Sequence, residues 1–187
     1  MIEGVHIWRA TLDGFSPDQP RHRRTAAHSA LRQVLAGYLG QPPAAVEIEE
    51  GEDGKPRLPG GELQFNLSHS GDLALVAVSA SRPVGVDVER VEPGRDFVAL
   101  AERALAEEDS EAVRAAAPGD RSAIFYAAWV RHEARLKCLG AGLTGPVPDS
   151  PVAVQGVEVG PGYAAAVAVA VAGKKAPPLR LRTLSPR

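Results

Sequence analysis

The sequence predicts an α+β protein made of two similar lobes, each with a helix and a set of strands. Two observations predict this class. Apolar residues recur at helical spacing in residues 25–40 and 121–143, and strand-like apolar runs accompany each helix. In addition, residues 71–89 and 162–182 share one plan, which is a glycine, an apolar run, a proline-containing turn and then alternation. We therefore expect a pseudo-twofold duplication.

The elements of the first half are predicted from local patterns. Residues 2–10 alternate loosely and predict a strand. The stretch SPDQPRHRR, residues 16–24, predicts a loop that leads into the helix at 25–40, and Gly40 is expected to cap the C-terminus of that helix. Residues 63–80 then predict two strands that are joined by a Ser/Gly turn.

The second half is expected to run from strand to helices and back to strands. Strands are predicted over residues 82–91 and 156–184, and helices over 95–108 and 121–143. Asp96 is a suitable N-cap for the first of these helices, and the second should end at Gly140 or Gly142. We expect lobes of residues 1–83 and 84–187, with the active site between them.

Composition excludes several classes of protein. The 187 residues are 44% hydrophobic, which is enough for a packed core, and the formal net charge of −2 does not indicate a general binder of nucleic acid. Cys138 is the single cysteine, so no intramolecular disulfide is expected and a reducing setting fits. The N-terminus resembles no secretory signal, and no apolar run reaches the ~20 residues of a membrane span. We expect a cytoplasmic protein without membrane contact.

Two carboxylates share one face of the strand VGVDVERV. Because side chains alternate along a strand, Val84, Val86 and Val88 should face the core, while Asp87 and Glu89 face the other way. Two acids on one face repel each other unless a cation lies between them. The simpler alternative is an edge strand with solvated acids.

A third acid lies on the helix segment WVRHEARLK. At ~100° per residue, Trp129, His132, Glu133 and Leu136 share one face, with Lys137 at its border. The simpler alternative is an i,i+4 ion pair between Glu133 and Lys137 on the surface. Three acids beside a lysine instead suggest a hard divalent cation such as Mg²⁺ together with a phosphorylated ligand.

The segment FNLSHSGD offers groups that suit a phosphate. Ser68, His69, Ser70 and Gly71 are expected to form a polar turn, and such turns present backbone N–H groups and hydroxyls to phosphate oxygens. The alternative is an ordinary hairpin turn with His69 exposed.

Four motifs in this order resemble the 4′-phosphopantetheinyl transferases, and most closely the larger, two-lobed type named after the surfactin-synthesis enzyme. They are GKP at 54–56, FNLSHSG at 65–71, VGVDVERV at 84–91 and WVRHEARLKCLGAGL at 129–143. The resemblance covers about residues 20–145. One departure is His132, which stands where the family usually has a lysine.

The resemblance implies a role for each matched residue. Asp87, Glu89 and Glu133 would hold Mg²⁺, and Lys137 would contact the coenzyme A pyrophosphate. His69, with Ser68 beside it, would bind the 3′-phosphate, while Lys55 and Pro56 would flank the adenine. Arg23 and Arg32 are weaker candidates for the 3′-phosphate. Asp87, Glu133 and Lys137 would carry the catalysis, with Glu133 as the base.

The implied reaction transfers the phosphopantetheine arm of coenzyme A to a serine of an apo acyl, polyketide or peptidyl carrier protein. The expected partners are coenzyme A and the carrier, without nucleic acid, and the family favours a monomer. A Mg²⁺-dependent phosphohydrolase could use the same acids. A non-catalytic paralogue that binds coenzyme A or a carrier is the third possibility.

Overall fold

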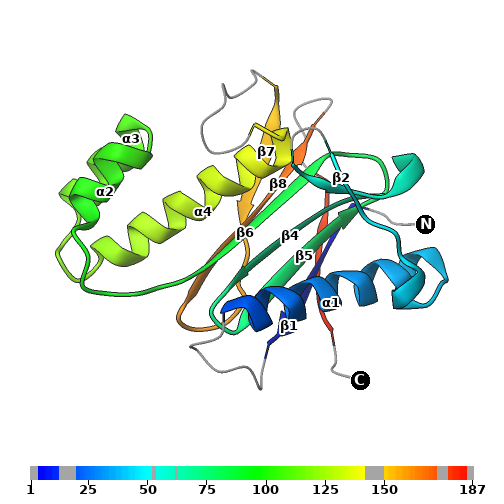
Figure 1. The fold of residues 1–187 in the computed structure, drawn as a ribbon. Coiled ribbons are helices and arrows are strands. Elements are labelled where there is room, and N and C mark those ends of the chain that lie inside the picture. Colours follow the sequence, from blue (N-terminus) through cyan, green and yellow to red (C-terminus); the bar gives the residue numbers. More distant parts are fainter. Residues whose placement is uncertain are drawn as a thin grey trace.

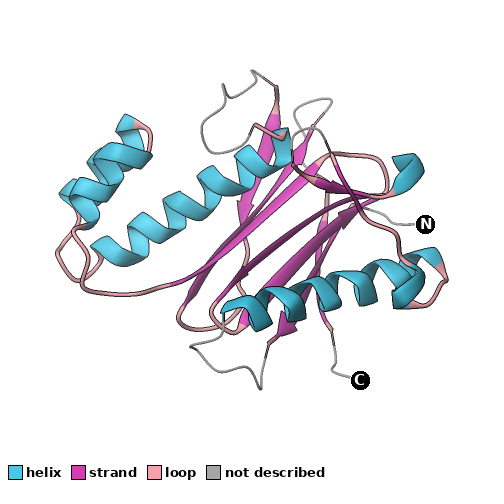
Figure 2. Cartoon of the chain, viewed as in Figure 1, coloured by secondary structure: helices cyan, strands magenta, loops and turns pink. Residues whose placement is uncertain are grey.

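The computed structural model describes residues 4–12, 20–51, 54–61, 63–141, 150–171 and 177–184. Two sheets pack face to face, and a long helix covers the outer face of each (Figure 1). The helices are α1 (Pro20–Leu39), α2 (Phe97–Ala104), α3 (Glu107–Ala115) and α4 (Arg121–Leu139). Figure 2 shows the same arrangement by secondary structure, with α2 and α3 beyond one end of α4. The predicted α+β class is confirmed.

The larger sheet has the strand order β4-β5-β1-β9. Its members are β1 (Val5–Thr11), β4 (Gln64–Ser70), β5 (Leu73–Ser79) and β9 (Leu179–Thr183). Strand β5 pairs antiparallel with β1 and with β4, whereas β9 runs parallel to β1 and places Leu179 opposite Val5. The C-terminal strand β9, which was expected within the second lobe, therefore belongs to the sheet of the first.

The smaller sheet has the order β6-β8-β7, and both of its pairings are antiparallel. Its members are β6 (Val84–Arg90), β7 (Val152–Gly156) and β8 (Tyr163–Ala170). A short hairpin, β2 (Glu49–Glu50) with β3 (Pro56–Arg57), and two 3₁₀ turns, η1 (Pro43–Ala45) and η2 (Pro59–Gly61), lie between α1 and β4.

The core lies between the sheets and under the two long helices. Val84, Val86 and Val88 pack among side chains of the larger sheet, as the alternation of β6 predicts. On the outer faces, Leu31 and Leu35 of α1 pack on the larger sheet, and the helix α4 packs on alanines of β8. The buried acid Asp87 therefore faces α4, so the alternative of solvated acids is wrong for Asp87, although β6 is the edge strand of its sheet.

The long helix and three paired strands follow one order in both halves, although β2 and β3 are inserted in the first half and α2 and α3 in the second. The series β1-α1-β4-β5 forms three strands in the order β4-β5-β1, and β6-α4-β7-β8 forms three strands in the order β7-β8-β6. The two helices also end alike. Gly40 and Gly140 both have φ 67°, and each donates its N–H to the carbonyl four residues earlier.

Several predicted ends of helices and strands differ from those in the structure. Helix α1 begins at Pro20, inside the expected loop, because proline suits the first helical position, where its missing N–H is not needed. The helix predicted over 95–108 ends at Ala104, and α3 was missed. Strand β7 begins four residues before the predicted strand region. Gly142 lies outside the described residues, and α4 is capped by Gly140.

The turn predicted at Ser68–Gly71 is also wrong. Residues Ser68, His69 and Ser70 continue β4, and only Gly71 and Asp72 connect it to β5. Gly71 has φ 56°, which a glycine adopts without a steric penalty, so a two-residue connection is sufficient.

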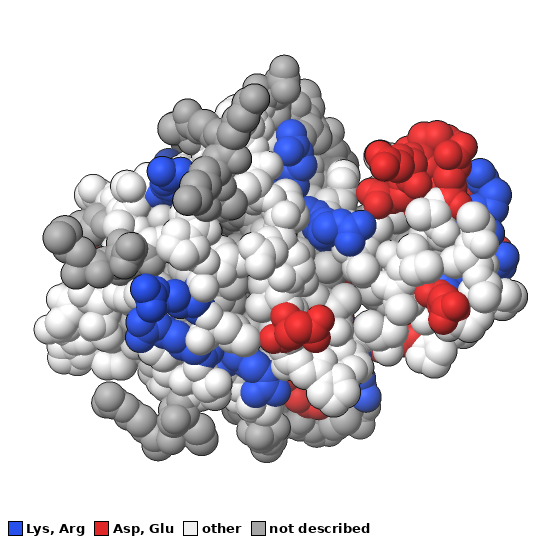
Figure 3. Space-filling view, turned by 180° about the vertical axis from the view of Figure 1, so that it is seen from behind, with Lys and Arg blue, Asp and Glu red and all other residues white. Residues whose placement is uncertain are grey.

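Charge is unevenly distributed over the surface. Figure 3 shows acidic side chains gathered at the end of the molecule where α3 lies, and basic side chains running across the opposite side. The first turn of α3 carries Glu107, Glu108 and Asp109, which suit the positive end of a helix dipole. Within the described residues, no helix has the length and apolar character that crossing a membrane requires.

Candidate active site

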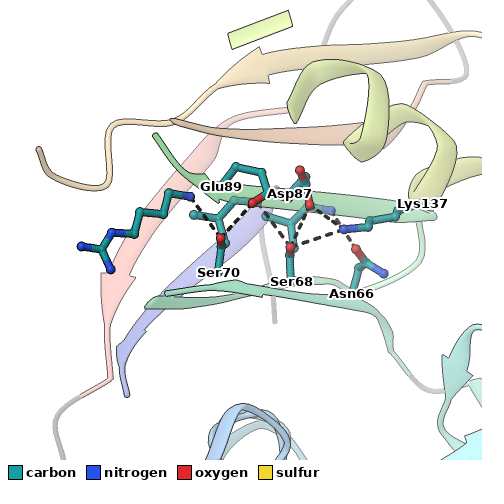
Figure 4. A network of polar contacts seen from close by, with 9 residues as sticks. Asn66, Ser68, Ser70, Asp87, Glu89 and Lys137 are labelled. Atoms are coloured by element: carbon teal, nitrogen blue, oxygen red, sulfur yellow. Dashed lines mark hydrogen bonds and ion pairs between the residues drawn. The ribbon is translucent and has the colours of Figure 1, made fainter. Parts of the chain in front are cut away.

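The candidate site lies where β4 and β6 run side by side, although the two strands belong to different sheets (Figure 4). Side chains of β4 make the connection. Asn66 Oδ1 accepts the Val86 N–H at 2.9 Å, Ser68 Oγ accepts the Val88 N–H at 3.3 Å, and Ser70 Oγ accepts the Arg90 N–H at 3.1 Å. We call this row of contacts the seam. It satisfies backbone donors of β6 that have no strand partner on this side.

Asp87 is the most deeply buried acid at the seam, with 2% of its surface exposed. Its Oδ1 accepts hydrogen bonds from Lys137 Nζ at 2.5 Å and from Ser68 Oγ at 2.8 Å. Its Oδ2 is buried without a hydrogen-bond partner among the described protein atoms. An unpaired buried carboxylate oxygen is costly, which marks this atom as a position for a ligand.

Gly85 explains how Lys137 reaches Asp87. A Cβ at this position would lie 2.1 Å from the Ala134 carbonyl oxygen and 2.4 Å from the Cys138 nitrogen, and both are backbone atoms of α4. Only glycine therefore lets α4 approach β6 this closely. The glycine and the aspartate of the VGVDV motif thus have separate tasks, because one admits the helix and the other binds its lysine.

Glu89 and Glu133 flank this pair. Ser70 Oγ donates to Glu89 Oε2 at 2.8 Å, and Glu133 is buried with its Oε1 unpaired among the described atoms. Burial raises the pKa of the Glu133 carboxyl, Lys137 opposes this rise, and the charges of Asp87 and Glu89 add to it. Burial likewise raises the pKa of Glu89, against the hydrogen bond from Ser70. Both acids would gain from a nearby cation.

The three acids do not form a ready-made cage. Among the residues that the structure describes, no group of three His, Cys, Asp or Glu side chains is arranged to hold a metal ion. Their role as metal ligands stays a prediction. The donor chemistry nevertheless suits Mg²⁺, because two buried carboxylate oxygens are free and Mg²⁺ commonly takes only one or two carboxylates beside substrate phosphates.

A cleft of about 570 Å³ lies on the Lys137 side of the seam, between the β3–β4 region and the end of α4. Lys55 and Pro56 line it, as do Phe65, Pro83 and Leu139. Lys55 Nζ also donates to the carbonyls of Val84 at 2.9 Å and Lys137 at 2.8 Å. Lys55 therefore ties the β2–β3 hairpin to the start of β6 and the end of α4, a role that its sequence motif does not reveal.

A second cleft, of about 420 Å³, lies on the other side of the acids. Ser70, Glu89, Tyr126 and Trp129 are among its lining residues. The His132 ring lies 6.1 Å from the Trp129 ring, centroid to centroid, so His132 packs beside the aromatic wall of α4. The two clefts thus leave room for a long ligand on either side of Asp87.

His69 points away from the seam and toward α1, because it alternates with Ser68 and Ser70 along β4. The side chain is exposed. Desolvation by the surrounding protein lowers the pKa of His69, and the positive charges of His28, Arg24 and Lys137 lower it further. His28 and Arg24 were missed from the sequence, although their i,i+4 spacing places them together on one face of α1.

The two predicted arginines of α1 are engaged elsewhere. Arg23 forms an ion pair of 2.6 Å with Asp72, and Arg32 donates to the carbonyl of Val46. The structure therefore brings together Ser68, Asp87, Glu89, Glu133 and Lys137 at the seam. It leaves His69 on the α1 side and places Lys55 with Pro56 in the cleft beyond Lys137.

Comparison with known proteins decides the family. A family profile described as the 4′-phosphopantetheinyl transferase superfamily matches residues 83–174, which include β6 and α4. The 4′-phosphopantetheinyl transferase HetI of Nostoc is 35% identical in an alignment of 169 positions that covers 76% of this chain and 71% of that protein. The chain belongs to the 4′-phosphopantetheinyl transferase superfamily. The family and the enzyme class that the ordered motifs predicted are therefore confirmed.

Other members of the superfamily are similar over shorter lengths. The 4′-phosphopantetheinyl transferase of Bacillus subtilis is 31% identical over 71% of this chain and 58% of its own length. The transferase AcpT of Salmonella typhimurium is 33% identical over 68% of this chain and 66% of its own length. The chain thus spans less than two thirds of the length of each of these two relatives.

Proposed function

We propose that this transferase moves the 4′-phosphopantetheine arm of coenzyme A, with Mg²⁺, to a serine of an apo carrier protein. The observation that carries the proposal is the pair of buried Asp87 with Lys137 between two clefts, with Glu89 and Glu133 beside it. This combination offers oxygen ligands for a cation and an ammonium for a phosphate, which are the two needs of a bound pyrophosphate.

The layout supports a coenzyme A molecule that lies along the seam. Its pyrophosphate would lie beside Asp87 and Lys137, and its adenine would occupy the larger cleft near Pro56. The cluster of His69, Arg24 and His28 supports a 3′-phosphate on the α1 side, because all three side chains can donate to phosphate oxygens. Arg23 is the weaker candidate, since Asp72 already holds it.

The reaction needs one proton acceptor and one leaving group. The carrier serine oxygen would attack the phosphorus that bears the pantetheine, and the bond from that phosphorus to the bridging oxygen would break. Adenosine 3′,5′-bisphosphate then leaves with the bond's electron pair. Glu133 would accept the serine proton, because its buried Oε1 has no hydrogen-bond partner among the described protein atoms. Bound Mg²⁺ would supply Lewis-acid stabilisation of the pyrophosphate charge.

We also infer that the chain is of the two-lobed type and arose by duplication. The repeated order of elements and the matching glycine caps of α1 and α4 support this inference. Residues 1–83 and 84–187 remain the proposed lobes, with β9 returning to the first sheet. A monomer in the cytoplasm is the state that we propose for it.

Incubation with coenzyme A, Mg²⁺ and several apo carriers, followed by intact-mass measurement of the carriers, tests the proposal. A carrier that gains one phosphopantetheine supports it. Release of adenosine 3′,5′-bisphosphate without any modified carrier would favour the phosphohydrolase. Binding of coenzyme A without either product would favour the non-catalytic paralogue.

A further inference from the structure

Ser70 forms two hydrogen bonds whose directions are fixed by chemistry. The Arg90 N–H can only donate, so it takes a lone pair of Ser70 Oγ at 3.1 Å. The single hydroxyl hydrogen then points to Glu89 Oε2, which lies 2.8 Å away. The hydroxyl is therefore anchored to the backbone of β6 and aimed at a carboxylate of the same strand.

Two residues earlier, the same arrangement occurs. Ser68 Oγ accepts the Val88 N–H at 3.3 Å and donates to Asp87 Oδ1 at 2.8 Å (Figure 4). At Asp87 the consequence is visible, because Oδ1 is engaged while Oδ2 remains unpaired. One oxygen of each acid is thus held by a serine, and at Asp87 the other oxygen has no partner among the described protein atoms.

We propose that Ser70 is a positioning residue, which fixes the Glu89 carboxylate so that its second oxygen is presented to a divalent cation. This inference rests on the proposed function, since it assumes that Glu89 faces the bound cation. A flexible glutamate loses rotamer freedom when it binds an ion, and a hydrogen bond that already fixes it reduces this loss. Ser70 lies on β4 of the larger sheet and Glu89 on β6 of the smaller sheet. The contact between the two sheets therefore orients Glu89 before a cation binds.

The test is the affinity for Mn²⁺, measured by electron paramagnetic resonance on the full chain without coenzyme A. Ser70→Ala should raise the Mn²⁺ dissociation constant about tenfold, and Ser70→Thr, which keeps the hydroxyl, should restore it to within about twofold of wild type. Ser79→Ala is the matched control. Ser79 is buried in β5 and accepts the Arg82 N–H, so its loss should affect stability without changing Mn²⁺ affinity.

A second measurement separates positioning from general damage. With coenzyme A and carrier, Ser70→Ala should need more Mg²⁺ for half-maximal rate, while kcat at saturating Mg²⁺ stays close to wild type. Circular dichroism reports folding, and Ser70→Cys, which is nearly isosteric but a weak donor, replaces Ser70→Ala if that variant does not fold. Ser70→Cys should then show the same loss of Mn²⁺ affinity.

Three results would overturn the inference. One is an unchanged Mn²⁺ affinity in folded Ser70→Ala, and another is a folded Ser70→Thr that fails to restore it. The third is an equal loss in Ser79→Ala, which would indicate general destabilisation. A wild-type protein that binds no Mn²⁺ in either the absence or the presence of coenzyme A would overturn the metal part of the proposed function as well, so the two failures are distinguishable.

Discussion

The two long helices occupy equivalent places in the two halves but carry different chemistry. Aligned on their capping glycines, Gly40 and Gly140, they place Gln33 of α1 opposite Glu133 of α4, and Gly37 opposite Lys137. Each helix covers the outer face of its own sheet. Only α4 contributes a buried acid and a lysine to the seam. One scaffold therefore supports packing in the first half and a candidate catalytic face in the second.

The strands at the seam differ in the same way. Strand β4 offers neutral side chains, Asn66, Ser68 and Ser70, which hold the backbone of β6. Strand β6 offers the acids. Since neutral hydroxyls can donate to carboxylates without repulsion, the first half can orient charges that only the second half carries. This difference between the two halves can be tested with variants that remove a charged group of the second half or that place in one half the residue type of the other.

The largest effect is expected from Asp87→Asn. This change removes the charge that pairs with Lys137 while keeping the size of the side chain, so the fold should persist. We expect carrier modification, measured as kcat/KM at ordinary Mg²⁺, to fall about a hundredfold or more. Wild-type turnover in the folded variant would show that Asp87 is not part of the active site. The second half would then lack the chemistry that we assign to it.

His69→Ala tests whether the first half of the chain contributes to coenzyme A binding. The His69 side chain lies with Arg24 and His28 on the α1 side, so it should read the 3′-phosphate. A charge-assisted contact of ~1.5–3 kcal/mol predicts a loss of coenzyme A affinity of roughly ten- to a hundredfold. Calorimetry with dephospho-coenzyme A, which lacks that phosphate, is the control. Equal losses for the two ligands would contradict the assignment.

Gly85→Ala and Gly37→Ala should have opposite effects on stability. At Gly85 the added methyl would overlap the backbone of α4, so we expect a loss of about 1–3 kcal/mol together with weaker transfer. At Gly37, on α1, nothing lies within 4 Å of the added atom, and the higher helix propensity of alanine should stabilise by about 0.5–1 kcal/mol. Urea unfolding measures both. A loss at Gly37 or a gain at Gly85 would be inconsistent with the described packing.

Glu133→Gln places in α4 the residue type that α1 has at the equivalent position, Gln33. The substitution should change the free energy of unfolding by a small amount that depends on pH. Burial raises the pKa of Glu133 in the folded state. The protonated carboxyl therefore contributes stability at pH values below the ordinary pKa of a glutamate. This contribution is lost as the pH rises through the pKa of the folded state. Without added metal, the variant should therefore be more stable than wild type at pH 7, and the gain should shrink as pH falls toward 4.

Chemical unfolding at several pH values measures this difference. Glu111→Gln on α3 is the control, because Glu111 is exposed and lies outside the seam. If the gain in stability at pH 7 did not shrink at low pH, the folded protein would not be raising the pKa of Glu133. Transfer activity should fall in the same variant, since its base would be lost.

Local sequence patterns predicted the periodic and chemical features of the fold. Helical spacing located α1 and α4, alternation placed Val84, Val86 and Val88 in the core, and the ordered motifs identified the family. These features depend on residues close together in the chain, and a regular element converts local spacing directly into a shared face.

Which polar groups contact one another depends on tertiary packing, and the sequence did not predict it. Ser68 was expected to serve a phosphate in a turn, yet it lies inside β4 and binds Asp87, while Lys55 holds carbonyls of β6 and α4. Strand β9 likewise joins a sheet that begins more than a hundred residues earlier. The direction of a hydroxyl or an ammonium is set by whichever unpaired backbone and carboxylate atoms packing brings near it. Such partners are distant in sequence, so no local pattern encodes them.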